Sequence, residues 1–336
     1  MNVPPTESIR NVAVVSNAGS GKTSLVEALA YCAGSLSAPG SIQAGSTVSD
    51  FEPEEIHHRT SLNTGVLRCL FKETVLNLLD TPGSPSFVAE VCSALRVADA
   101  VVLVVNAPTG VRSDLQRVWS LIREAKLPCI VFVNGLDKER TAFATTVEEV
   151  AKELDVAVVP LTLPSGSGEQ LKDVVDLLQN CVVTMRPDRP QAQQAPVPSE
   201  RREQIDQARR RVTEVVAEGD EALLERYLTD GGLTDEALLG GLRSAVQRGT
   251  VVPVIGGSAL RNLGVHTLLQ CLVDLMPSPI ARAQAVPLQG AGSVEGGDSI
   301  SREPLVTAPF SGLVFKTIID PFVGRLSYVR VYSGTL

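Results

Sequence analysis

The chain has 336 residues, 44% of them hydrophobic, which is enough for two or three domains with sizeable cores. Its formal net charge of −8 at pH 7 argues against a broad basic face, so we expect no direct DNA binding. Six scattered cysteines without a CxxC pair are predicted to be small buried residues of a reducing compartment. Residues 1–10 show no secretory leader, and no apolar run could span a bilayer, so we expect a cytoplasmic protein outside membranes. We also expect a monomer.

Up to about residue 155, strand-like and helix-like segments alternate along the chain. Apolar runs typical of buried strands lie at 11–17, 74–80, 100–106 and 129–134. Helical patterns lie at 24–33, 86–97 and 113–125. Buried strands that alternate with helices predict a mostly parallel sheet with helices on both faces, which is an α/β fold.

The pattern changes near residue 156. Short strands are predicted at 157–163 and 181–185, a stretch rich in proline and glutamine at 186–198, and two or three helices within 200–247. A strand and a helix return at 251–255 and 264–276. We therefore predict an α+β insertion at 156–249 inside a first domain made of residues 1–155 and 250–280.

The last part of the chain has a different character. Residues 281–303 are predicted to form a linker, because they contain glycine and serine and show no periodicity. Residues 307–317 and 324–332 alternate like strands, which predicts the beginning of a β-barrel domain at 304–336. Two or three strands cannot bury a core, so we expect this domain to be truncated.

A glycine-rich loop with a lysine follows the first predicted strand. Its residues are Ser16, Asn17, Ala18, Gly19, Ser20, Gly21, Lys22 and Thr23, and Ser24 comes directly behind them. The glycines let backbone N–H groups approach a phosphate, Lys22 neutralises the terminal phosphates, and the Thr23 hydroxyl completes a magnesium shell. The helix N-terminus also favours phosphate, so residues 17–24 are predicted to bind a nucleoside triphosphate. The alternative is an ordinary glycine turn, since Ser16 replaces the first glycine of the usual pattern.

The sequence Asp80-Thr81-Pro82-Gly83 stands at the end of the predicted strand 74–80. A carboxylate at a strand end can hold magnesium through water, and the N–H of Gly83 can reach the γ-phosphate. Asp, Pro and Gly also form ordinary turns. The position downstream of a phosphate loop favours the functional interpretation.

The sequence Asn134-Gly135-Leu136-Asp137 ends another predicted strand. A carboxylate here can accept hydrogen bonds from N1–H and N2–H₂ of guanine, whereas adenine would leave it unpaired at a cost of about 1–3 kcal/mol. The backbone of Ser258, Ala259 and Leu260, after the last sheet strand, could contact guanine O6. The predicted ligands are GTP or GDP with Mg²⁺, and the alternative of an ATPase would rest on Lys22 and Thr23 alone.

Two short polar runs are open to a second interpretation. His57 and His58 could suggest a metal site, but adjacent residues point in different directions and no further ligand lies nearby, so a solvated pair is expected. The run Arg209-Arg210-Arg211 is predicted to be a solvated helix face rather than an RNA-binding patch.

In this order, the four motifs resemble a translational GTPase of the elongation factor G family, in particular its divergent elongation-factor-G-like branch. Stretches within 47–55, 77–100, 253–279 and 320–336 extend the resemblance, which is weakest over 187–247, the place of the family's G′ insertion. The resemblance implies GTP binding, two switch segments and the ribosome as partner. It assigns the β- and γ-phosphates to Lys22, magnesium to Thr23 and Asp80, the γ-phosphate to Gly83, and the base to Asn134 and Asp137. Ser61 takes the place of the first-switch threonine, a magnesium ligand.

Three residues depart from the family pattern. Ser84 stands where the family has the histidine that positions the attacking water, and losing one such group typically costs on the order of 10²–10⁴ in rate. Gly19 replaces an aspartate that helps to hold a monovalent cation, and Gly135 replaces a lysine that packs along the base. We therefore expect slow or conditional GTP hydrolysis, with Lys22, Gly83 and Ser84 as the catalytic group. The alternative is a GTP-regulated binding protein without turnover.

Overall fold

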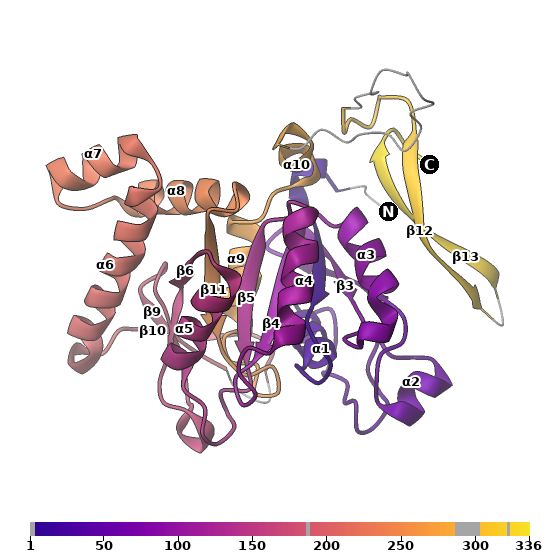
Figure 1. The fold of residues 1–336 in the computed structure, drawn as a ribbon, viewed down its shortest axis with the longest axis horizontal. Coiled ribbons are helices and arrows are strands. Elements are labelled where there is room, and N and C mark those ends of the chain that lie inside the picture. The colour runs from indigo at the N-terminus through magenta and orange to yellow at the C-terminus, as the bar shows by residue number, and fades with distance from the viewer. Residues whose placement is uncertain (1–3, 186–188, 286–302, 321–322) are drawn as a thin grey trace.

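A seven-stranded sheet forms the centre of the protein (Figure 1). The computed structural model describes residues 4–185, 189–285, 303–320 and 323–336. The strands follow the order β2-β3-β1-β4-β5-β11-β6, and only the β2–β3 pair is antiparallel among the described strands of this sheet. Their bounds are β1 Ile9–Val15, β2 Gly65–Phe71, β3 Thr74–Asp80, β4 Ala100–Asn106, β5 Cys129–Asn134, β6 Ala157–Pro160 and β11 Val251–Gly256. The mostly parallel sheet predicted from the sequence is confirmed.

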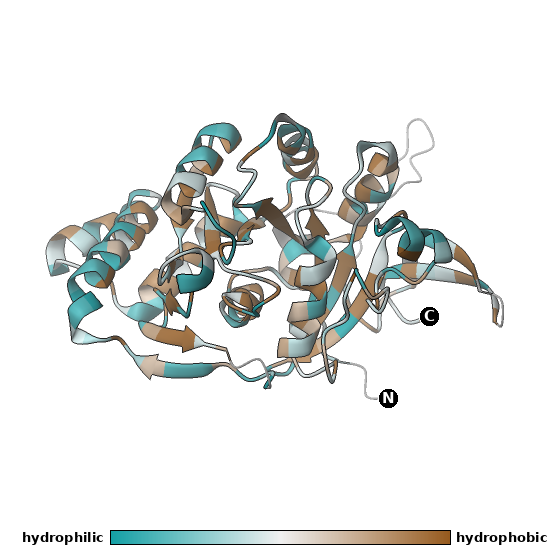
Figure 2. Cartoon of the chain, turned by 90° about the horizontal axis from the view of Figure 1, so that it is seen from below, coloured by the Kyte–Doolittle hydropathy of each residue, from teal (hydrophilic) through white to brown (hydrophobic). Residues whose placement is uncertain are grey.

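Helices cover both faces of this sheet because the inner strands are buried on both sides. Val12 and Val14 of β1 belong to one core cluster, and Ala13 and Val15 belong to the other. The first cluster includes side chains of α1 (Lys22–Cys32) and α9 (Val265–Asp274). The second includes side chains of α3 (Val88–Val97), α4 (Ser113–Glu124) and α5 (Phe143–Leu154). Figure 2 shows hydrophobic colour gathered on the central strands, whereas the peripheral helices carry much of the hydrophilic colour.

Strand β2 is absent from the sequence-based prediction. It joins β3 through Lys72 and Glu73, whose φ angles are 46° and 64°. Such a two-residue turn normally carries asparagine, aspartate or glycine, so the sequence lacks the usual hairpin signal. The helix predicted at 86–97 begins later, at Val88, because a 3₁₀ turn over Pro85–Phe87 precedes it.

The segment predicted as an insertion contains a second sheet and three described helices. The sheet is antiparallel, in the order β10-β9-β8-β7, with β7 Thr162–Pro164, β8 Val174–Asp176, β9 Cys181–Thr184 and β10 Gln193–Pro196. The helices are α6 Arg202–Glu218, α7 Glu221–Asp230 and α8 Asp235–Gln247. The single strand predicted at 157–163 is divided at Leu161: β6 pairs with β11 in the central sheet, whereas β7 belongs to the small sheet.

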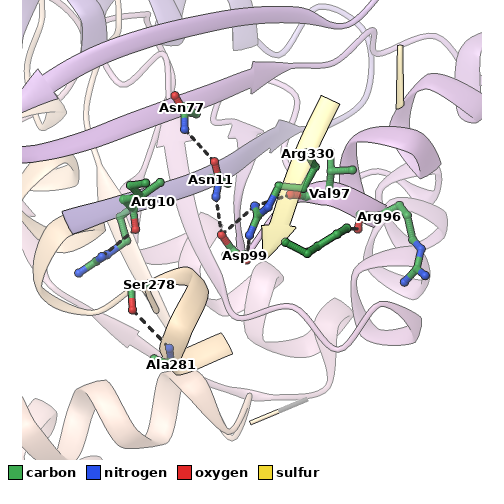
Figure 3. A network of polar contacts seen from close by, with 11 residues as sticks. Arg10, Asn11, Asn77, Arg96, Val97, Asp99, Ser278, Ala281 and Arg330 are labelled. Atoms are coloured by element: carbon green, nitrogen blue, oxygen red, sulfur yellow. Dashed lines mark hydrogen bonds and ion pairs between the residues drawn. The ribbon is translucent and has the colours of Figure 1, made fainter. Parts of the chain in front are cut away.

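The C-terminal hairpin of β12 (Ser311–Asp320) and β13 (Gly324–Ser333) packs beside α3. Arg330 forms two hydrogen bonds of 3.0 Å with the carboxylate of Asp99, and its Nη1 also donates to the carbonyl of Val97 at 2.8 Å (Figure 3). Asn11 of β1 donates to the same carboxylate at 2.6 Å. Before the hairpin, α10 (Pro279–Ala285) occupies the start of the predicted linker, and residues 286–302 lie outside the described residues.

The remaining short elements are η1 Thr6–Ser8, α2 Pro53–His58, η3 Gly168–Gln170 and η4 Ser199–Arg201. Within the described ranges, none of the helices is long and apolar enough to cross a bilayer. All six cysteines are free thiols. Four are buried as predicted (Cys32, Cys69, Cys129 and Cys271), Cys181 is half-buried, and the prediction is wrong for Cys92, which is exposed on α3.

Candidate functional site

The glycine-rich loop connects the end of β1 to the start of α1. Gly21 adopts the left-handed conformation, with φ of 88°, and a side chain at this position would collide with the amide of Asn134. Lys22 is buried, and its Nζ donates to the carbonyl of Asn17 at 3.0 Å, so the ammonium group folds back over the loop. Burial lowers the pKa of Lys22 to about 8, although Asp80 and Asp50 act in the opposite direction.

Beside this loop lies a hollow that we call the phosphate cavity; its lining includes Gly21, Lys22, Thr23, Asp50, Ser61 and Gly83. The Thr23 and Ser61 hydroxyls lie 3.3 Å apart, although 38 positions separate them in the sequence. Gly83 packs directly against the loop, since a Cβ there would lie 2.6 Å from Asn17 O and 2.7 Å from Ala18 N. The structure thus brings together five of the predicted residues, Gly21, Lys22, Thr23, Ser61 and Gly83, which come from separate parts of the sequence.

Asp80 stands at the end of β3 with 1% of its surface exposed. Neither carboxylate oxygen has a hydrogen-bond partner, although the Thr23 and Ser49 hydroxyls lie close enough to lower its pKa. Buried carboxylates are normally paired, so two unpaired oxygens indicate a missing partner. Together with the Thr23 and Ser61 hydroxyls they form the all-oxygen set that Mg²⁺ prefers. The residues present therefore fit a magnesium ion.

Asp50 is a member of the cavity that the sequence analysis does not identify. It is buried, its Oδ1 has no hydrogen-bond partner, and burial raises the pKa of its carboxyl group. No motif surrounds it, and it lies in the loop before α2, so only its place in the fold marks it.

The ionisation of Asp80 is expected to make the nucleotide-free chain less stable as the pH rises. Burial raises the pKa of this carboxyl from 3.8 to about 7, so between these values the folded chain keeps a proton that the unfolded chain has lost. This contribution to the free energy of unfolding is present below pH 3.8 and is lost as the pH rises through about 7. Urea midpoints of the wild type and Asp80→Asn, compared at about pH 5 and about pH 8, measure it. A difference between the two proteins that does not change with pH would contradict the expectation.

Ser84 points its hydroxyl at its own backbone. Its Oγ accepts a hydrogen bond of 3.4 Å from the N–H of Ser86 and thereby caps the 3₁₀ turn Pro85–Phe87. It lines a neighbouring cavity between α3 and α4, together with Pro85, Val88 and Asp114. The hydroxyl is thus engaged locally, one residue beyond Gly83.

Asn134 connects the glycine-rich loop to the segment after β11. Its Nδ2 donates to Ser20 O at 3.0 Å, and its Oδ1 accepts from the N–H of Ala259 at 2.9 Å. The N–H of Ser258 bonds to Leu263 O at 3.0 Å. Two of the three N–H groups that the sequence offers to guanine O6 are therefore used within the protein. The third belongs to Leu260, whose side chain is exposed.

Asp137 carries a buried Oδ1 without a hydrogen-bond partner. Close by, Gly135 adopts a φ of 81°, and a Cβ there would lie 3.1 Å from Asn106 Oδ1. Asp137 can thus accept a ligand donor, while the side chain that would pack along a base is absent at residue 135. Ser24, in contrast, contributes to α1 and does not line the phosphate cavity.

Three carboxylates hold the backbone of residues 40–64 in place, and the sequence analysis assigns none of them this role. Glu27 accepts hydrogen bonds from Gly40 N at 2.7 Å and Val48 N at 2.5 Å. Glu55 accepts from the N–H groups of residues 62 and 63 at 2.9 and 3.0 Å. Glu90 accepts from that of residue 64 at 2.9 Å. Glu27 could have been suspected, because it is the single acidic residue of the otherwise mostly apolar helix α1.

The histidine pair and the arginine run were both predicted to be solvated, and the structure agrees for the first and only in part for the second. His57 and His58 end α2 as exposed side chains whose rings meet edge to face, with centroids 4.8 Å apart. Arg210 and Arg211 are exposed on α6. Arg209 contradicts the prediction of a solvated face, because it is half-buried, donates to two backbone carbonyls at 3.1 and 3.2 Å and forms an ion pair with Asp235.

A parallel sheet whose first loop carries a lysine and a threonine at the start of a helix, next to an aspartate at the end of a neighbouring strand, is the arrangement of a P-loop nucleotide-binding protein. Residues 7–278 match the family described as the elongation factor Tu GTP binding domain. The chain is 33% identical, over 98% of its length, to elongation factor G of Thermotoga petrophila and to that of Thermotoga maritima. It covers 47% of each of these proteins.

A solved structure shows the same likeness. A crystal structure of a protein from Thermus thermophilus superimposes with a TM-score of 0.83 and 35% sequence identity, over 98% of this chain and 46% of that one. The protein therefore belongs to the family of the elongation factor Tu GTP binding domain, and nearly all of the chain is similar to elongation factor G. The chain spans about half the length of the curated relatives it matches.

Proposed function

We propose that the chain binds GTP and GDP with Mg²⁺ and hydrolyses GTP slowly. The observation that carries this proposal is the unpaired carboxylate of Asp80, which is buried beside Lys22 and Thr23, two residues that line the phosphate cavity. A bound cation would pair with this carboxylate, and a bound phosphate would pair with Lys22.

In this proposal each residue has one role. The loop N–H groups and Lys22 bind the phosphates, and Thr23, Ser61 and Asp80 would hold the magnesium ion, which neutralises charge on the phosphate oxygens. Water attacks the γ-phosphorus, the bond to the β–γ bridging oxygen breaks, and GDP leaves with the electron pair. Gly83 offers its N–H to the γ-phosphate. Asn134 positions the loop, and Asp137 accepts hydrogen bonds from guanine.

The rate of hydrolysis is proposed to be low because of Ser84. Its hydroxyl is occupied by the N–H of Ser86, cannot carry a positive charge, and reaches less far than an imidazole. The same observation favours the second candidate function, a GTP-regulated binding protein without turnover, in which GTP orders the segments around Ser61 and Gly83.

The partner is proposed from the relatives alone. Elongation factor G is the name of proteins that match 98% of this chain. We propose a ribosome-associated translation factor, with residues 156–249 as an insertion in the GTP-binding domain and 304–336 as the beginning of a β-barrel domain. A cytoplasmic location and a monomeric state belong to the same proposal.

Asp137→Ala is expected to remove most of the preference for guanine. The buried Oδ1 would no longer discriminate between bases, so GTP should lose about 1–3 kcal/mol of binding free energy while ATP is little affected. Calorimetric titrations of GTP and ATP, each with Mg²⁺, measure both values. Asp155→Ala, an exposed aspartate at the end of α5, serves as the control. Equal losses for both nucleotides would contradict the role assigned to Asp137.

Two measurements test the function as a whole. Calorimetry with GDP, GTP and ATP establishes the ligand, and ATP binding more tightly than GTP would overturn the assignment of the base. Single-turnover phosphate release, with and without ribosomes, separates the two candidate functions. Release of phosphate supports the GTPase, whereas tight GTP binding without any release, in the presence of ribosomes, supports the binding protein.

A further inference from the structure

Arg59 stands at the point where the chain turns from α2 toward the phosphate cavity. It caps the C-terminus of α2 with φ of 52° and ψ of 39°, and its N–H donates to Glu55 O. Arg59, Thr60 and Ser61 then line the same cavity as Lys22 and Gly83. The turn therefore places a second cation beside the glycine-rich loop.

The guanidinium group of Arg59 has no protein partner among the described residues. It is exposed, and no hydrogen bond or ion pair joins it to another described side chain or carbonyl. Other arginines of the chain are held by such contacts, for example Arg330 by Asp99 and Arg201 by Asp173. An unpaired guanidinium at the rim of a cavity is suited to a multiply charged oxyanion such as a phosphate, because its planar fork can donate two hydrogen bonds to neighbouring oxygens.

The backbone that follows Arg59 is held in place by the protein. Glu55 is buried four residues earlier and accepts hydrogen bonds from the N–H groups of residues 62 and 63. Two residues after Arg59, the Ser61 hydroxyl lies 3.3 Å from that of Thr23. Residues 61–63 are thus held by the buried carboxylate and by the loop, which keeps the backbone of Arg59 beside the phosphate cavity.

The conformation of Arg59 is unfavourable for its residue type. Left-handed helix caps are normally glycine, because any Cβ is crowded at positive φ. A glycine would serve the turn better, but it would leave the cavity without this cation. Seven other described residues besides glycine also have a positive φ, but Arg59 is the one of them that lines the phosphate cavity.

We propose that Arg59 is a catalytic residue that contacts the γ-phosphate of GTP, supplied by the chain itself. The inference rests on the proposed GTP hydrolysis. As the water oxygen bonds to phosphorus and the bond to the leaving oxygen of GDP breaks, negative charge grows on the γ-phosphate and the bridging oxygen. Arg59 stabilises that charge and exchanges no proton, while the proton of water ends on the released phosphate. Ser84 cannot stabilise this charge, because its side chain is neutral and caps its own turn, so the stabilisation comes from the cations that line the cavity, Lys22 and Arg59.

Arg59→Gly is the sharpest test, because it removes the whole side chain while glycine favours the left-handed turn. Single-turnover hydrolysis by the 336-residue chain loaded with GTP and Mg²⁺ should fall by about 10²-fold, while GDP affinity is unchanged. Arg59→Lys should recover only part of the rate, because an ammonium group lacks the planar fork. Arg68→Ala removes an exposed arginine of β2 outside the cavity lining and should leave the rate unchanged.

A binding measurement gives a second readout that does not need turnover. Aluminium fluoride added to GDP mimics the phosphate in transfer, so it should tighten calorimetric GDP binding to the wild type and to Arg68→Ala, but not to Arg59→Gly. Equal hydrolysis rates and equal tightening in wild type and Arg59→Gly would overturn the assignment of Arg59. Failure of the wild type to bind GTP would instead overturn the proposed function, so the two failures are distinguishable.

Discussion

Ser84→His is expected to accelerate GTP hydrolysis by about 10²–10⁴-fold in single-turnover measurements. The wild-type hydroxyl is engaged with Ser86, whereas an imidazole is longer and can orient a water molecule near the γ-phosphate. Gly83 next to it packs against Asn17 and Ala18, so the new side chain starts from a fixed position at the loop. The loss of the 3.4 Å capping contact should cost little stability, since the turn begins with Pro85.

The matched control is Ser86→His, two residues along the same turn. It introduces the same group beyond the capping contact and should leave the hydrolysis rate as it is in the wild type. GTP affinity measured by calorimetry should stay constant in both variants, which separates chemistry from binding. An unchanged rate for Ser84→His would show that the missing histidine is not what limits hydrolysis.

Arg330→Met is expected to lower the free energy of unfolding by about 3–5 kcal/mol. The Arg330 and Asp99 side chains are 11% and 4% exposed, so the substitution leaves a buried carboxylate with Asn11 as its remaining donor (Figure 3). It also removes the hydrogen bond to Val97 O, which fastens the hairpin to the end of α3. Urea unfolding followed by fluorescence of the single tryptophan, Trp119, measures the change.

Two further variants serve as controls for the stability change of Arg330→Met. Arg325→Met, an exposed arginine of the same strand β13, should change the stability by less than about 0.5 kcal/mol. Asp99→Asn combined with Arg330→Met should recover part of the loss, because no unpaired charge is then buried. A loss below about 1 kcal/mol for Arg330→Met would show that the hairpin is not energetically coupled to the sheet.

Some strands could be placed from the sequence to the residue. The apolar runs at 74–80, 100–106 and 129–134 predict strands with the same bounds as β3, β4 and β5. These strands are buried on both faces, so a continuous apolar run bounded by polar residues determines both ends. Strand β2 lies at the edge with a partly exposed surface, and its Lys72-Glu73 turn carries no glycine, so the same reasoning cannot find it.

The site divides in a similar way. Lys22, Thr23, Asp80 and Gly83 could be chosen from the sequence, because each belongs to a short motif whose chemistry is local. Asp50 and Arg59 belong to no such motif. Their importance follows from where the segments before and after α2 lie relative to the glycine-rich loop.

The sequence by itself determined the buried inner strands, the parallel sheet and the residue types offered to phosphate, magnesium and base, because these depend on short-range patterns of polarity and on local chemistry. Only the tertiary structure decided which of those residues meet. The bond from Asn134 to Ala259 spans 125 positions, and the contact between Thr23 and Ser61 spans 38. Such contacts depend on sheet order and on buried carboxylates that hold loops in place, and no local pattern encodes them.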